Sequence, residues 1–299
     1  MPSARRQRLP DQQIRSEQPG LVMKEKKRIF IVVKTYPSIS KKHIELVCTA
    51  GVLEDGSWIR LYPIPFRRLE TFQKYPKYTW IEVEVERNTG DFRPESYRPD
   101  ISTLRVEKKP KEVDWNERRK VVFKNKKVYA DLGELIEKSK NDGLSLAIFK
   151  PSKILDFKIE PTEREWDAET LAYFEQESRQ LNLFLSPEKI KEQFKVVKKV
   201  PYKFSYRLED ITGKESTMMI SDWEIGALYF KCLRDANGDE EVALSKVREK
   251  YYDEFLKKDL HLFLGTTKEY HNVAPNPFII IGVFYPPEKL QMDLPLPNL

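Results

Sequence analysis

The stretch IELVCTAGVLEDGSWIRLY, residues 44–62, decides the fold of the N-terminal half of the chain. Its first part, 44–53, is rich in apolar and β-branched side chains, which is typical of a strand. The Glu-Asp-Gly tripeptide at 54–56 follows, and Asp-Gly tolerates the positive φ angles that a tight hairpin turn requires. The sequence therefore predicts a hairpin whose second strand covers 58–62.

Further strand patterns lie on both sides of this hairpin. The run RIFIVVKT at 28–35 is β-branched, and 101–107 is a weaker candidate. In 78–87, Ile and Val alternate with Trp and Glu, which indicates a strand with one core face and one wet face. We expect an α+β protein whose N-terminal half is a small twisted antiparallel sheet or a partly closed β-barrel.

The rest of the chain mixes helical and strand patterns. Asp114 with Glu117 resembles a capping box that opens a short basic helix, and Ser221 with Glu224 repeats the pattern before an apolar stripe of helical period. The remaining elements predicted by periodicity are helices at 131–140, 166–181 and 244–255, and strands at 144–149, 154–159, 196–206, 217–220, 260–266 and 277–285.

These elements suggest a division of the 299 residues into four segments. We expect a disordered basic tail at 1–26 and a mainly-β domain with inserted helices at 27–160. An α+β module with a helical hairpin at 161–286 and a Pro-rich tail at 287–299 complete the chain.

Net charge says little about the folded part of the chain. The total is +6, but residues 1–28 hold eight basic and three acidic side chains, or +5, which leaves about +1 for everything else. Cys48 and Cys232 are the only cysteines, which is typical of a reduced compartment. No apolar run reaches the roughly 18 residues of a membrane span, and we expect a cytoplasmic protein without a membrane partner.

The best functional clue is the segment SWIRLYPIPFRRLETFQKYPKYTW at 57–80. It holds five basic and seven aromatic residues with one acid. Arg and Lys can meet phosphates, and aromatic rings can stack on unpaired bases. Trp58, Arg60 and Tyr62 alternate along one strand and so share a face, which we interpret as an exposed nucleic-acid surface, although the same residues would also suit a half-buried sheet.

A second basic cluster spans 108–127, and Lys198 and Lys199 belong to a weaker third one. If these clusters face the same way as the first, they could follow a phosphate backbone together. The residues that we nominate for nucleic-acid contact are Trp58, Arg60, Tyr62, Arg67, Arg68, Lys74, Lys77, Arg118, Arg119 and Lys120.

An enzymatic alternative rests on Pro99-Asp100 followed by Glu107-Lys108-Lys109. This arrangement resembles the signature of PD-(D/E)xK nucleases, although the gap between the acids is short for that family. The resemblance implies that Asp100 and Glu107 hold Mg²⁺ while Lys109 activates water. Binding without catalysis, and without any cofactor or metal, is the interpretation that we prefer.

Two further interpretations complete the set. The loop that follows Gly265, with Lys268 and His271, offers groups that could bind an anion, but we interpret it as a turn after a buried strand. A third functional class is a non-enzymatic interaction protein whose C-terminal helices bind a protein partner or a second copy. Our leading hypothesis remains a protein that binds DNA or RNA through its N-terminal sheet domain.

Overall fold

The computed structural model describes residues 24–40, 44–107, 114–181 and 197–288. The expected hairpin is confirmed: β3 (Ile44–Leu53) pairs with β4 (Trp58–Ile64) in antiparallel register, with Val52 opposite Trp58. Gly56 occupies the turn with φ +91°, a conformation that side chains with a Cβ rarely adopt. A Cβ at this position would also lie 2.4 Å from the carbonyl oxygen of Lys124.

Five strands of the N-terminal half close into a barrel. β1 (Glu25–Lys34) pairs with β3 on one side and with β5 (Thr79–Arg87) on the other. β6 (Ser96–Pro99) closes the gap, pairing in parallel with β4 and antiparallel with β5. Along the chain, β1, β3 and β4 follow one another as neighbours, and β5 then returns to lie beside β1. The resulting spatial order, β5-β1-β3-β4, is a Greek key. The partly closed β-barrel expected from the sequence is thus confirmed.

Alternating side chains fill the barrel. Ile81, Val83 and Val85 of β5 point inward and are fully buried, whereas the glutamates between them are half-buried on the outside. Inward residues of β1 and β4 complete the same cluster. The period-2 pattern therefore predicted correctly which face of β5 is core.

Local patterns failed at the barrel's last strand. The predicted strand 101–107 is a 3-10 helix, η3 (Ile101–Thr103), followed by the short β7 (Arg105–Val106). The strand that closes the barrel is instead β6, within a segment that carries no alternation. The expected tail at 1–26 also extends too far, because Glu25 and Lys26 belong to β1; its residues 1–23 lie outside the described part of the chain, as do residues 289–299 of the Pro-rich tail.

Two short 3-10 helices, η1 (Phe66–Arg68) and η2 (Thr71–Gln73), connect β4 to β5, and the short β2 (Ser38–Ser40) pairs with the first half of β3. Beyond the barrel, α1 (Trp115–Val122) and α2 (Leu132–Asp142) begin after capping aspartates, Asp114 and Asp131, as the sequence predicts. The short β8 (Val128–Tyr129) lies between these two helices.

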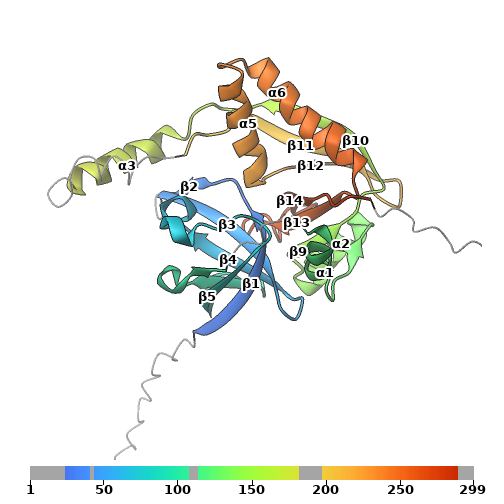
Figure 1. The fold of residues 1–299 in the computed structure, drawn as a ribbon, viewed down its shortest axis with the longest axis horizontal. Coiled ribbons are helices and arrows are strands. Elements are labelled where there is room, and N and C mark those ends of the chain that lie inside the picture. The colour runs from blue at the N-terminus through green and yellow to red at the C-terminus, as the bar shows by residue number, and fades with distance from the viewer. Residues whose placement is uncertain (1–23, 41–43, 108–113, 182–196, 289–299) are drawn as a thin grey trace, which may run out of the picture.

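The C-terminal part contains two further sheets covered by helices (Figure 1). One has the order β14-β13-β9-β8 and the other β10-β11-β12. The elements are β9 (Leu146–Phe149), β10 (Lys153–Pro161), α3 (Ala168–Leu181), β11 (Tyr202–Glu209), β12 (Glu215–Met219), α5 (Trp223–Asp235), α6 (Glu240–Arg248), the π-helix η4 (Glu249–Glu254), η5 (Phe255–Lys257), β13 (His261–Thr266) and β14 (Phe278–Phe284).

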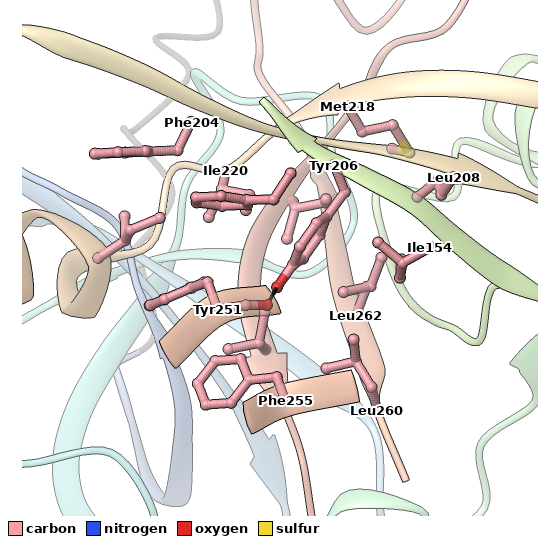
Figure 2. Packing of buried hydrophobic residues seen from close by; sticks show 14 of the residues in the cluster. Ile154, Phe204, Tyr206, Leu208, Met218, Ile220, Tyr251, Phe255, Leu260 and Leu262 are labelled. Atoms are coloured by element: carbon pink, nitrogen blue, oxygen red, sulfur yellow. Dashed lines mark hydrogen bonds between the residues drawn. The ribbon is translucent and has the colours of Figure 1, made fainter. Parts of the chain in front are cut away.

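Two apolar clusters hold this part together and to the barrel. The larger one lies between its sheets and the α5–α6 hairpin, where the buried Tyr206 hydroxyl donates to the carbonyl oxygen of Tyr251 (Figure 2). The other lies between the barrel and the sheet of β13 and β14, with Phe30 and Phe263 among its members. Because β9 pairs with β13 across more than a hundred residues, the C-terminal sheet assembles from both sides of Pro161.

Candidate nucleic-acid interface

Trp58, Arg60 and Tyr62 do share the outer face of β4, because Ile59 and Leu61 point into the barrel core. The C-terminal part covers most of this face. Trp58 packs edge-on against Phe263, with 6.0 Å between ring centroids. Only Tyr62, which is half-buried, lies beyond the covered stretch.

Arg60 is 3% exposed, so the expectation that it lines an exposed surface is wrong. Its guanidinium donates to Ser145 at 3.0 and 3.2 Å and to Glu95 at 3.3 Å. The Sγ atom of Cys48 lies 3.6 Å away. The side chain is buried because the C-terminal sheet lies directly over this part of β4, where Ser145, just before β9, contacts Arg60.

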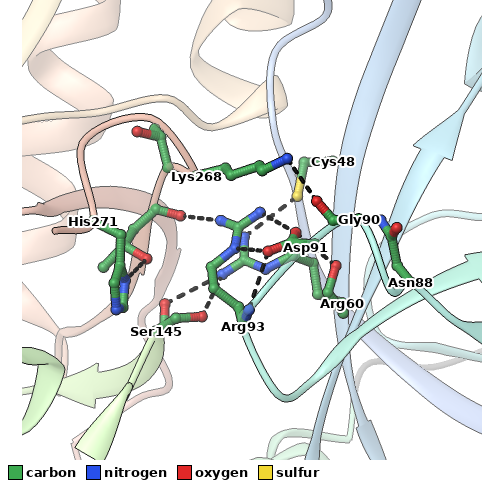
Figure 3. Close-up of polar contacts among 12 residues, drawn as sticks. Cys48, Arg60, Asn88, Gly90, Asp91, Arg93, Ser145, Lys268 and His271 are labelled. Carbon is green, nitrogen blue, oxygen red and sulfur yellow. Dashed lines mark hydrogen bonds and ion pairs between the residues drawn. The ribbon is translucent and has the colours of Figure 1, made fainter. Parts of the chain in front are cut away.

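A second buried arginine lies beside Arg60 in the junction between the two parts (Figure 3). Arg93 donates to both carboxylate oxygens of Asp91, at 2.9 and 2.6 Å, and to the carbonyl oxygen of Thr266 at 2.6 Å. Burial raises the pKa of Asp91, but hydrogen bonds from Arg93 and Ser96 outweigh this and hold it well below its usual range. Both arginines are therefore neutralised and hold the two parts together.

The junction ends in two exposed loops that touch each other. Lys268 donates to the carbonyl oxygen of Gly90 at 2.6 Å, and the ring of Phe92 packs against His271 with 5.0 Å between centroids. His271 is 1% exposed, and burial lowers its pKa. Phe92 and Tyr270, by contrast, are 49% and 52% exposed.

Tyr62 belongs to the same neighbourhood. It lies two residues beyond Arg60 on the same face of β4, and Arg60 pairs with Glu95 at the end of the loop that carries Phe92. Burial raises the pKa of the Tyr62 phenol. Sequence reasoning missed Phe92 and Tyr270, and it treated Lys268 only as part of a turn. The available signal was a bulky aromatic residue inside each polar loop segment, GDFRP and KEYHN.

The connection between β4 and β5 divides the other nominated residues of this segment. Arg67 donates to Glu45 at 2.5 Å with its side chain 32% exposed, while Arg68 and Lys74 are exposed. Phe72, between them, is 73% exposed.

Lys77 is buried, so its nomination as a surface contact is wrong. Its ammonium group lies 2.9 Å from both Asp222 and Glu224, beneath the first turn of α5. Burial lowers the pKa of Lys77, but the two carboxylates outweigh this and raise it. Asp222 also caps α5, by accepting a hydrogen bond from the Glu224 N–H, so the cap lies one residue later than the expected Ser221.

In the basic cluster of α1, Arg118 and Arg119 serve packing, whereas Lys120 is exposed. Arg118 stacks over Tyr78 and Trp115, Arg119 pairs with Asp259 at 2.8 Å, and Lys120 pairs with Glu117. Just after α1, Lys124 donates to the carbonyl oxygen of Glu54 in the β3–β4 turn.

This cluster therefore lies at the Trp58 end of β4, about 20 Å along the strand from the Ile64 end that leads to Arg67. The third cluster lies near the first, because the N–H of Val197 donates to the same Glu45 carboxylate as Arg67, at 3.0 Å.

The residues of the nuclease alternative are held apart. The N–H groups of Asp100 and Glu107 donate to carbonyl oxygens of Glu84 and Trp80, four residues or about 13 Å apart along β5. Asp100 pairs with Lys24, and Glu107 pairs with Arg28. Lys109 lies outside the described residues. Within the described ranges, no group of three or more His, Cys, Asp or Glu side chains is placed to hold a metal ion.

The fold and the junction define a class of protein: a closed Greek-key barrel joined through buried arginine pairs to an α+β part. The chain belongs to the family described as Domain of unknown function (DUF8757), whose model matches residues 129–297, more than half of the sequence. A second model, Domain of unknown function (DUF8758), matches residues 25–124. No curated protein sequence matches the chain.

The two family models divide the chain between 124 and 129, just after α1, whereas we expected the division near Pro161. The barrel with α1 thus corresponds to one model, and the sheets with the α5–α6 hairpin correspond to the other. Among the helices that the structure describes, none has the length and apolar character needed to cross a bilayer.

Proposed function

We propose that this protein binds single-stranded nucleic acid on a surface formed by Tyr62, Phe92, Lys268 and Tyr270, which we call the ring surface, with Arg67 beyond the end of β4 as a further cationic contact. The observation that carries the proposal is the pair of exposed rings, Phe92 and Tyr270, on two loops that the Lys268–Gly90 hydrogen bond holds together. Exposed aromatic side chains on a fixed support are the stacking platforms that unpaired bases use.

The charges around these rings suit a nucleic-acid backbone. The ammonium group of Lys268 is exposed, and Arg67 is half-exposed at the end of β4. Arg98 is also exposed, and one of its guanidinium nitrogens lies 3.4 Å from the position of a Cβ on Gly90. Because the buried arginines are already neutralised, we expect only a few phosphate contacts and a modest salt dependence.

The barrel architecture agrees with this proposal. Five-stranded Greek-key barrels include the OB fold, which binds oligonucleotides on the face of its second and third strands. Here those strands are β3 and β4, and on the outer face of β4 Trp58 and Tyr62 are half-buried whereas Arg60 is buried. A shared architecture does not assign a function by itself, so the exposed side chains have to do so.

The test is fluorescence anisotropy with a labelled single strand of about 20 nucleotides, as DNA and as RNA, beside a matched duplex, at about 50 and 200 mM salt. We expect the wild type to bind the single strand more tightly than the duplex. The Phe92→Ala/Tyr270→Ala variant loses two stacking contacts, each worth about 1 kcal/mol or more. It should therefore bind the single strand at least about 10-fold more weakly than the wild type.

Tyr173→Ala is the matched control, since Tyr173 is 37% exposed on α3, outside both loops. It should bind like the wild type. Absence of single-strand binding by a folded wild type at low salt would overturn the proposal. Equal weakening by the control and the double variant would show that the ring surface is not the binding site.

A further inference from the structure

A pocket of about 460 Å³ lies in the C-terminal part, and its wall residue Val197 shares the Glu45 carboxylate with Arg67. The segment after β10, the segment before β11 and the helices α5 and α6 form its walls. Its lining includes Arg164, Trp166, Lys198, Tyr229, Phe230 and Glu240. This volume is within the range of small-molecule sites, and three aromatic rings line it.

The rings are held in place before any ligand binds. The indole N–H of Trp166 donates to the carbonyl oxygen of Val197 at 2.7 Å. Tyr229 packs edge-on against Phe230, with 5.1 Å between centroids, and against Tyr202 at 5.6 Å. A flat ligand would therefore lose little binding free energy to reordering of these walls.

Two glutamates line the pocket, the exposed Glu165 and Glu240, and in the described part of the chain only Glu240 is satisfied by hydrogen bonds. Glu240 accepts two hydrogen bonds from the Arg164 guanidinium, at 2.6 and 2.8 Å, and one from the Tyr202 hydroxyl at 2.5 Å. These bonds lower the pKa of Glu240 to about 2, so that it stays ionised and paired. It has little capacity left to select a cationic ligand.

The cations on the rim have unequal roles. Lys199 pairs with Glu163 at 3.0 Å and donates to the carbonyl oxygen of Glu165. Lys198 is exposed, and among the described residues its ammonium group has no hydrogen-bond or ion-pair partner. Lys198 is therefore the rim lysine that is available to an anionic group of a ligand, while Glu165 adds a negative charge to the same lining.

We propose that this pocket binds a nucleoside monophosphate, with the base against Trp166 and Phe230 and the phosphate on Lys198. A planar aromatic group joined to an anion matches both halves of the lining. The ligand is either a free nucleotide or the terminal nucleotide of a strand. Binding of a free nucleotide here does not depend on the ring surface, so the two proposals can fail separately.

Isothermal titration calorimetry of the full chain with AMP, GMP, CMP and UMP tests the site, with adenosine and inorganic phosphate as partial ligands. We expect at least one monophosphate to bind, and its nucleoside to bind about 10-fold more weakly. Loss of one stacking partner in Trp166→Ala should weaken the monophosphate about 5- to 150-fold, while Trp166→Phe should keep most of the affinity. Lys198→Ala should weaken AMP but leave adenosine unchanged.

Tyr270→Ala, on the ring surface, is the matched control and should bind monophosphates like the wild type. If Trp166→Ala also weakens binding of the labelled single strand, the ligand is a strand terminus; if only the monophosphates are affected, it is a free nucleotide. No heat from any of the four monophosphates at about 1 mM, or equal affinity in wild type and Trp166→Ala, would overturn the proposal, whatever the oligonucleotide result.

Discussion

The two ends of the outer face of β4 carry similar side chains but have different environments. At Trp58 and Arg60, the C-terminal sheet covers an aromatic ring and a guanidinium, which become part of the junction. Toward Tyr62 and Arg67, the same kinds of side chain remain partly in contact with solvent. A mixture of basic and aromatic residues therefore does not by itself identify a binding surface, because a second sheet decides which of these side chains are used for packing.

The largest expected effect distinguishes Arg60 from Arg67. Arg60→Ala should lower the free energy of unfolding by about 3 to 5 kcal/mol, because it leaves Glu95 without its buried partner. Arg67→Ala should cost less, about 1 to 3 kcal/mol, because its side chain is 32% exposed and the buried Glu45 keeps the hydrogen bond from the Val197 N–H. The same variant should also weaken single-strand binding. Urea denaturation beside anisotropy measures both quantities.

Arg60→Met/Glu95→Gln serves as the control, because it removes both charges and should recover part of the lost stability. Equal loss of unfolding free energy in Arg60→Ala and Arg67→Ala would contradict the proposed difference between the two ends of β4.

Two buried lysines near the end of the barrel differ in their charge partners, and this difference predicts how stability depends on pH. Lys77 meets two carboxylates, whereas Lys34 lies 4.3 Å from the ring centroid of Phe66 and donates to one carbonyl oxygen. Burial and the nearby charge of Lys77 lower the pKa of Lys34 to about 8, from an ordinary value of 10.5. Between pH 8 and 10.5 the unfolded chain therefore holds more protons at this position than the folded protein.

The contribution of Lys34 to stability should consequently rise as the pH increases through this window, by at most about 1.4 kcal/mol per pH unit. Lys34→Met removes the titrating group, so the difference in unfolding free energy between the two proteins should change along this slope. Denaturation at several pH values from 7.5 to 10.5 measures it. A difference that stays flat across the window would show that the folded amine keeps its ordinary pKa.

The smallest expected effect concerns α1. Lys120→Ala removes an exposed pair with Glu117 and should change the free energy of unfolding by no more than about 0.5 kcal/mol. Single-strand affinity should also stay within about twofold, because the helix lies at the Trp58 end of β4. A large loss of affinity would extend the interface to α1 and contradict the division between the two ends.

Much of the fold could be predicted because its signals are local. The β3–β4 hairpin needs only a β-branched run, an Asp-Gly turn and a second run, and β5 needs only alternation. β6 could not be found in this way, since Ser96–Pro99 is a strand only through partners on both sides, in β4 and β5. Non-local pairing of this kind leaves no period in the sequence.

The candidate site was predictable to a lesser degree. Composition singled out Tyr62 and Arg67, which are half-exposed, but it also singled out Arg60 and Lys77, which are buried. Exposure depends on which distant segment packs against a residue, and Ser145 and Asp222 provide the cover here. Local composition carries no information about such partners.

The sequence by itself determined the strand-rich first half, the hairpin, the capped helices and the basic and aromatic character of residues 57–80. Each of these depends on side chains within a few positions of one another, where propensity, capping and period act directly. Only the tertiary structure decided that the barrel closes, that Arg60 and Arg93 bind it to the C-terminal sheet, and that the loops of Phe92 and Tyr270 touch each other. Those outcomes rest on burial and contact between distant segments, which are properties of the folded chain as a whole.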